Sequence, residues 1–244
     1  MKAHPLDDAD TRRRYWKLKM IKEDGNVVLF KKKLTAYLKR QEEKVVDSLA
    51  EGKIFKKDLI DELFNLELEA KIAREELTPL LHDFAEKSGV EAMEFAGSNY
   101  QFSLSSEIVS NLDKRAELFA LSINKTTFEK LKSELRISIE QGESRQEMVS
   151  RIRETYGDIS KGRANTIART ETGSAMTTGT FEGYKQAKVE SKVWTAVMDG
   201  ATRDSHAWLD GEKVPLNQPF SNGLAYPRDP RGRASEVVNC RCVL

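Results

Sequence analysis

Cysteine and histidine are scarce in this chain, whose 244 residues include two cysteines and three histidines. A disulfide framework is therefore not expected, and this suits a reducing compartment. Long apolar runs are also missing, because no stretch approaches the roughly 20 apolar residues of a transmembrane helix. The first ten residues, MKAHPLDDAD, lack the apolar segment of a signal peptide. We accordingly expect no membrane partner.

Several motifs that would identify an enzyme are absent. The sequence contains no Walker motif, no glycine-rich dinucleotide loop and no HExxH zinc motif. A strong net charge is absent as well, since the formal charge is +1, so the charge of the whole chain indicates neither nucleic acid nor a membrane as a partner. We predict that the protein is not an enzyme and has no cofactor.

The charge is distributed unevenly along the chain. Residues 1–60 contain sixteen Lys and Arg against ten Asp and Glu, whereas residues 61–100 contain three against ten. We expect two adjacent helical regions of opposite sign to pair with each other. The alternative is that the basic N-terminal block binds DNA or an acidic partner.

The patterning predicts a mainly α fold, in which an extended helical N-terminal region is followed by a small α+β C-terminal module. Charged residues make up 32% and apolar residues 39% of the chain, a balance typical of long helices with solvated faces. Apolar residues at helical spacing predict helices over residues 7–23, 29–50, 55–87, 106–121, 124–141, 146–155 and 161–188. Residues 91–104 fit a short strand or an irregular crossing. We divide the chain into 1–104, 105–190 and 191–244.

The predicted helix over residues 161–188 has small residues along one side. They are Ala164, Ala168, Thr172, Ala175, Gly179 and Gly183. Glycine inside a helix costs up to about 1 kcal/mol relative to alanine, so several of them predict close contact with another helix.

The sequence pattern changes after residue 189. There we expect a strand over 192–198, a short helix over 202–209 capped by Thr202, and a closing strand over 236–243. The segment between the short helix and the closing strand is rich in proline and glycine, which predicts loops. The small core predicted for this module is Trp194, Val197, Trp208, Leu209, Val214, Phe220, Val237, Val238 and Val243.

The strongest chemical candidate is a set of one histidine and two cysteines, His206, Cys240 and Cys242. In a strand the two cysteines would point to the same face, and such a set, with Asp204 or Asp210 as a fourth ligand, suits tetrahedral zinc. The alternative is that two buried thiols pack beside a hydrogen-bonded histidine, without a metal. We favour packing, and we predict no metal ligand and no catalytic residue.

Three further groups have simpler interpretations. A triad of Ser205, His206 and an aspartate is disfavoured, because neighbouring residues on a helix face apart. Arg169 and Glu171 are each expected to pair with a neighbouring residue across a helix interface. Arg228, Arg231 and Arg233, with Asp229, are expected to form a solvated loop.

The order of four segments resembles the phage Mu F-like minor head proteins, also described as phage head morphogenesis proteins. The segments are IARTETGSAMTTG at 167–179, KVWTAVMDGATRDSH at 192–206, LDGEKVPLNQPF at 209–220 and VVNCRCVL at 237–244. The resemblance covers roughly the last third of the chain. Its signature positions correspond here to Arg169, Thr170, Glu171, Trp194, Arg203, His206, Asp210, Gly211, Asn239, Cys240 and Cys242. The chain has Val237 and Val238 where many relatives have His-Pro.

The resemblance implies a structural role in the heads of tailed phages. Such a protein is expected to associate with the portal or the major capsid protein, and to lie in the virion, at the head interior or portal vertex, after assembly in the host cytoplasm. DNA would be a further partner of the basic N-terminal block. The alternative is a nucleic-acid-processing or group-transfer enzyme that uses His206 with Glu171 or Asp210.

Overall fold

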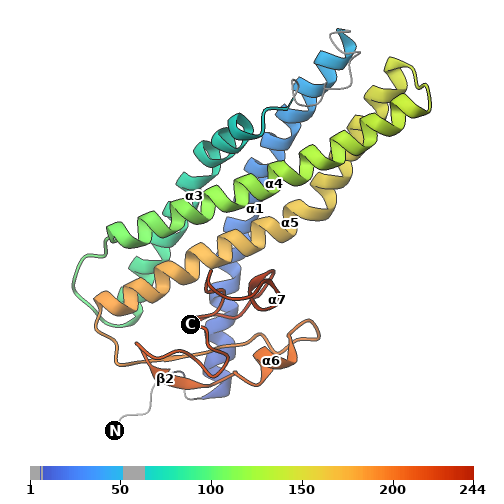
Figure 1. Cartoon of the computed structure of the whole chain (residues 1–244). Coiled ribbons are helices and arrows are strands. Elements are labelled where there is room, and N and C mark those ends of the chain that lie inside the picture. The colour runs from blue at the N-terminus through green and yellow to red at the C-terminus, as the bar shows by residue number, and fades with distance from the viewer. Residues whose placement is uncertain (1–5, 7, 52–63) are drawn as a thin grey trace. The chain divides into compact units, whose positions relative to one another are not determined.

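The computed structural model describes residue 6, residues 8–51 and residues 64–244. Within these residues four long helices account for most of the chain: α1 (Ala9–Ala50), α3 (Leu66–Phe95), α4 (Ser106–Glu140) and α5 (Arg145–Gln186). Short elements follow, namely β1 (Ser191–Val193), α6 (Asp204–Ala207), β2 (Lys213–Pro215) and α7 (Ala234–Val237). The predicted class, helical with a small C-terminal α+β module, is confirmed (Figure 1). No helix in the described ranges is both long and apolar enough to cross a membrane.

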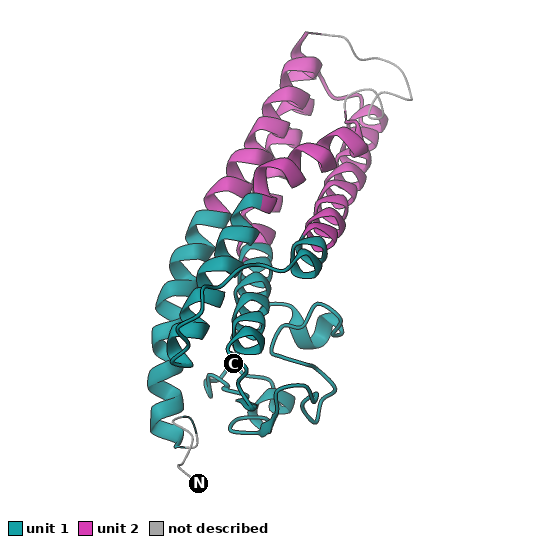
Figure 2. Cartoon of the chain, turned by 90° about the vertical axis from the view of Figure 1, so that its left-hand side faces the viewer, with its two compact units in different colours: residues 1–30, 79–112, 166–244 teal, residues 31–78, 113–165 magenta. Residues whose placement is uncertain are grey.

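The chain forms two compact units, each built from segments that are distant in the sequence (Figure 2). The first comprises residues 1–30, 79–112 and 166–244, and the second comprises residues 31–78 and 113–165. These units group segments by contact in space and do not test the predicted division of the sequence. That division, into 1–104, 105–190 and 191–244, stays a prediction. The C-terminal module thus shares its unit with the first part of α1.

The predicted break at residues 24–26 is wrong, because α1 runs through Gly25 without interruption. Gly25 has open space around it, so its cost is only the intrinsic one of a helical glycine. Val27 and Phe30 just beyond it are buried, with 3% and 0% of their surfaces exposed. Burial of the next turn therefore outweighs the local preference for a break.

Other predicted interruptions are also absent. The predicted helix end at residue 87 is wrong, since α3 continues through Gly89 to Phe95. The helices predicted over 106–121 and 124–141 form the single helix α4. The predicted end at residues 156–157 is likewise wrong, because α5 continues through it. Residues 98–104 contain no strand. Part of the predicted helix over 55–87 lies outside the described residues.

The connection between α4 and α5 follows the prediction. Gly142 has a positive φ of 65°, as expected after a helix end. Ser144 and Glu147 form a capping box, in which the Ser144 N–H donates to Glu147 Oε2 at 2.7 Å and the Glu147 N–H donates to Ser144 Oγ at 3.4 Å.

The small residues of α5 allow close contact with α3 within the first unit. A methyl group added at Gly179 would overlap the carbonyl group of Ala85, and one added at Gly183 would lie 2.5 Å from the Gly89 carbonyl oxygen. Gly89 itself leaves room for the ring of Phe102. The prediction of tight helix contact along this face is confirmed.

Opposite charges on α1 and α3 pair within each unit. In the first unit, Lys19 and Lys22 contact the Glu91 carboxylate at 3.3 and 2.8 Å. In the second, Lys44 contacts Glu69 at 3.0 Å, and Arg40 pairs with Glu76. These pairs confirm that part of the basic block faces the acidic region.

The C-terminal module has less regular structure than its sequence predicts. β1 and β2 pair antiparallel, with Lys192 opposite Val214, and an isolated bridge joins Thr195 to Val243. The closing strand predicted over 236–243 is wrong, since its first residues lie in or just after α7. The core includes Trp194, Leu209 and Phe220 as predicted. Trp208, also predicted there, is 89% exposed.

Candidate functional site

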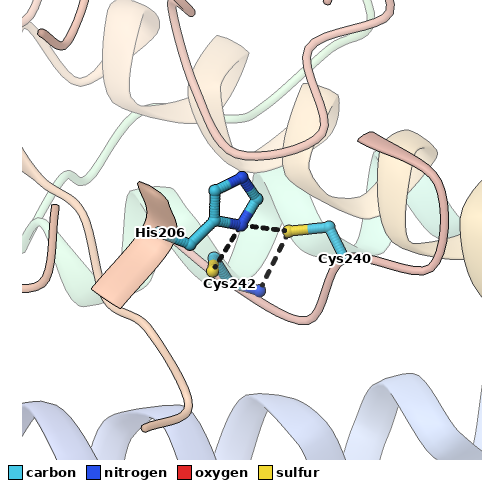
Figure 3. A group of neighbouring side chains, drawn as sticks. All are labelled: His206, Cys240 and Cys242. Carbon is cyan, nitrogen blue, oxygen red and sulfur yellow. Dashed lines mark hydrogen bonds between the residues drawn. The ribbon is translucent and has the colours of Figure 1, made fainter. Parts of the chain in front are cut away.

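The structure brings His206, Cys240 and Cys242 together into what we call the His–Cys cluster (Figure 3). His206 comes from α6, and the two cysteines come from the segment after α7. His206 Nδ1 lies 3.5 Å from the Sγ atoms of both Cys240 and Cys242. The side chains are almost inaccessible, with the residues 1%, 2% and 2% exposed. The sequence predicted this set, although not the backbone that carries it.

Glu236 fixes which nitrogen of the His206 ring carries the proton and which one faces the sulfurs. Its Oε2 lies 2.8 Å from His206 Nε2. An ionised carboxylate can only accept, so Nε2 carries the proton and donates to it. In the neutral ring, Nδ1 is then an acceptor facing both sulfurs. Ser205, adjacent in sequence, has its hydroxyl 3.4 Å from the same carboxylate oxygen, rather than forming the disfavoured triad.

The cluster has strongly perturbed acidity. A hydrogen bond from the Cys242 thiol lowers the pKa of Cys240 well below its usual value and, together with burial, raises the pKa of Cys242 well above it. Burial lowers the pKa of His206, but contacts with Cys240 and Glu236 outweigh burial and leave that pKa raised. At Cys240 and His206, polar contacts therefore shift the pKa more than burial does.

The position of the two cysteines depends on the left-handed backbone of Asn239 and on one hydrogen bond. Asn239 has a φ of +54°, a conformation that asparagine tolerates better than most residues. Its N–H donates to Thr170 Oγ1 on α5 at 2.9 Å. The Cys242 N–H then donates to Cys240 Sγ at 3.4 Å. This tight turn brings both thiols to the same imidazole nitrogen.

A second set of signature residues holds the loop around α6. Asp210 Oδ1 accepts from the Ala196 N–H at 2.9 Å, and Oδ2 contacts Arg12 at 3.2 Å. Gly211, with φ +83°, donates its N–H to the Trp194 carbonyl at 2.8 Å. Arg203 donates to the Val238 carbonyl at 2.6 Å. Within the described residues, the His–Cys cluster contains neither Asp204 nor Asp210 as a fourth member.

Arg228 is buried, so its predicted place in a solvated loop is wrong. Its guanidinium donates to Glu23 Oε2 on α1 at 2.6 Å, and the two side chains are 0% and 2% exposed. Gly173 on α5 has no side chain where that guanidinium lies, since a methyl group there would overlap it. Burial raises the pKa of Glu23, and Arg228 opposes that rise. The sequence offered no signal for this pairing across about 200 residues.

The remaining residues singled out in this region take part in ion pairs and ring contacts. Arg169 on α5 pairs with Asp24 on α1 at 3.3 Å, across a helix interface as predicted, and Glu171 is 8% exposed on α5. Arg231 is solvated, as predicted, and contacts Asp229 at 2.7 Å. The Asp229 side chain is 2% exposed, so its predicted place in a solvated loop is wrong. Trp194 is fully buried, and its ring lies edge-on to those of His206 and Phe220.

One protein family matches the part of the chain that contains these signature residues. Residues 129–244 match the family described as Phage Mu protein F like protein. The match confirms the resemblance, and it extends further toward the N-terminus than the four motifs do. The Mu F-like region therefore includes the end of α4, all of α5 and the C-terminal module.

Three curated relatives share parts of the chain. The minor head protein GP7 of Bacillus phage SPP1 is 29% identical over 109 residues, or 42% of this chain and 35% of GP7. The uncharacterized protein YqbB of Bacillus subtilis (strain 168) is 31% identical over 139 residues, covering 54% of this chain and 44% of YqbB. The NAD(+)--arginine ADP-ribosyltransferase EFV of Enterococcus faecalis (strain ATCC 700802 / V583) is 42% identical over 82 residues, covering 31% and 17%.

The chain spans less than half the length of each of these relatives. No solved structure matches it. The Mu F-like match and the minor head protein relative together support a role in phage head morphogenesis.

Proposed function

We propose that this chain is a minor head protein of a tailed phage or prophage, which acts in head morphogenesis by associating with the portal or the capsid interior. The observation that carries the proposal is the Mu F-like match over residues 129–244, together with the similarity to a phage protein named as a minor head protein. Its place would be the virion, at the head interior or portal vertex, with assembly in the host cytoplasm.

An exposed tryptophan supports a docking role for the C-terminal module. Trp208 follows α6 directly and is 89% exposed. Tryptophan is enriched among the residues that dominate binding energy in protein interfaces, because it buries a large rigid surface. The backbone beside it is held by Arg203 and Asp210, so the ring is presented on an ordered turn. We propose that Trp208 contacts the portal protein.

The direct test is co-expression with the portal protein of the same phage, followed by size-exclusion chromatography. The proposal expects the two proteins to elute together. Trp208→Ala should weaken the association by about tenfold or more, the range of an interface hot spot, with thermal stability unchanged. Tyr100→Ala is the matched control, since Tyr100 is a 76% exposed aromatic residue in the same unit. Separate elution of wild-type protein from both portal and capsid proteins would overturn the proposal.

We further propose that the chain works by binding rather than by catalysis. The matched segment is 17% of the ADP-ribosyltransferase, so that similarity concerns a small part of that protein. His206, the residue an enzyme would use here, is 1% exposed and already contacts Glu236 and both cysteines. Purified full chain should transfer no ADP-ribose from NAD⁺ to an arginine substrate and nick no DNA. Steady turnover in either assay would contradict the binding role.

A further inference from the structure

We propose that the His–Cys cluster is a zinc site, with His206 Nδ1 and the Sγ atoms of Cys240 and Cys242 as ligands. The three donor atoms all lie within 4.8 Å of one another. The inference stands apart from the head role, because it rests on these side chains alone. It selects the alternative that the sequence left open beside simple packing.

The separations fit a tetrahedral ion. Zinc lies about 2.3 Å from sulfur and about 2.0–2.1 Å from imidazole nitrogen, so a tetrahedral angle places nitrogen and sulfur about 3.6 Å apart. The observed distance from Nδ1 is 3.5 Å to each sulfur. A single nitrogen lone pair accepts one good hydrogen bond, whereas one zinc ion accounts for both equal distances. Figure 3 shows Nδ1 directed between the two sulfurs.

The surroundings of the cluster are those of a metal-binding histidine. Histidine ligands usually donate their second ring N–H to a carboxylate, which fixes the tautomer and aims the other nitrogen at the ion. Glu236 Oε2 supplies that carboxylate at 2.8 Å from Nε2. The Cys242 N–H, 3.4 Å from Cys240 Sγ, donates to the sulfur that would become a thiolate. Two thiolates balance the charge of one divalent ion.

The chemistry of the donors selects the metal. Thiolate and imidazole suit zinc, whereas magnesium and calcium prefer oxygen. Because no further protein ligand joins the cluster among the described residues, water would take the fourth position. The ion would tie α6 to a segment more than 30 residues later, in a module whose two strands have three residues each. Small modules with little regular structure commonly gain stability from such a link.

The experiment uses the full chain, purified under reducing conditions with a tag that contains no histidine. After incubation with zinc and dialysis, plasma mass spectrometry should find on the order of one zinc per chain. His206→Asn, Cys240→Ser and Cys242→Ser should each lose most of the metal. His82→Asn should retain it and controls for loss of a histidine elsewhere. Wild-type protein with less than about a tenth of a zinc per chain would overturn the proposal.

Two measurements on folded protein remain informative if a ligand variant fails to fold. Cobalt bound to the wild type should show the absorption of a tetrahedral thiolate complex, and a zinc chelator should lower the thermal midpoint, with recovery on adding zinc. Glu236→Gln should weaken zinc binding by about 10- to 100-fold while the protein stays folded. A midpoint that neither chelator nor zinc shifts would also overturn the proposal.

Discussion

One buried ion pair in the first unit joins residues from distant parts of the chain. Arg228 and Glu23 form an ion pair that is almost completely removed from water. Such a pair adds little over a well-packed apolar pair, but losing one partner leaves a charge buried alone. The two residues lie at opposite ends of the chain, so they fix the first helix against the C-terminal module. Gly173 supplies the space for this contact.

Removing one member of that pair should be costly. We expect Arg228→Met to lower the free energy of unfolding by about 3–5 kcal/mol, because the Glu23 carboxylate loses its partner in a buried place. The double variant Glu23→Leu/Arg228→Met should recover most of that loss. Urea unfolding of the single and double variants measures both effects. An equal loss in the double variant would show that packing, rather than the unpaired charge, sets the cost.

Lys192 should make stability depend on pH. Its residue is 2% exposed, its Nζ donates to the Leu216 carbonyl at 2.7 Å, and burial lowers the pKa of Lys192 to about 8. In the unfolded chain the pKa is about 10.4. Between these values the unfolded state binds more protons, so this residue makes stability rise with pH.

The corresponding variant is Lys192→Met. Relative to it, wild-type protein should gain up to about 3 kcal/mol between pH 8 and pH 10.5, since the cost of burying the charged amine disappears as it loses its proton. Urea unfolding of the two proteins across this range gives the difference. A difference that stays constant with pH would mean that Lys192 is not buried in its charged form at pH 8.

At the scale of the elements, close helix contact depends on a few glycines of α5. We expect Gly179→Ala to cost about 1–3 kcal/mol or more, because its methyl group would overlap the backbone of Ala85 and force α3 to shift. Gly162→Ala is the matched control on the same helix, where no atom lies within 4 Å, and it should stabilise by about 0.5–1 kcal/mol. Thermal unfolding of the two variants should shift in opposite directions.

The sequence predicts these elements better than their ends. Helical periodicity and the capping box at Ser144 are local, so the class of the fold and the α4–α5 connection follow from neighbouring residues. The continuation of α1 through Gly25 depends on tertiary burial of Phe30, which local signals cannot report. Likewise, the sequence identified His206 and both cysteines as a set. The contact between His206 and Glu236 could not be predicted, because Glu236 lies in the short helix α7, where the sequence pattern predicts a strand.

For the whole molecule, part of the basic N-terminal block is exposed, and we propose that this part contacts nucleic acid. Several lysines of α1 pair with acidic residues of α3, whereas Arg13, Arg14 and Lys17 are exposed. Arg13 also contacts the exposed Asp10, at 3.8 Å. If these three basic residues contact packaged DNA, each phosphate contact should contribute about 0.9 to the slope of log affinity against log salt. Changing all three to glutamine should reduce that slope by about 2–3 in a filter-binding titration.

A matched triple variant separates a local contact from general charge. Lys114, Lys125 and Lys130 are exposed on α4, outside the basic block, and their replacement by glutamine removes the same net charge. Equal loss of slope in both variants would contradict a DNA contact by the N-terminal block. No measurable DNA binding by the wild type would restrict the protein to protein partners.

Quantitative mass spectrometry of purified heads tests most directly whether the chain is a component of the phage head. Heads assembled with and without the portal protein are compared, with the chain measured relative to the major capsid protein. The proposed role predicts that the chain co-purifies with portal-containing heads at a constant minor ratio, and the proposed portal contact predicts a lower ratio in heads without the portal. Its absence from all assembled heads, with the protein present in the cells, would contradict the proposed role.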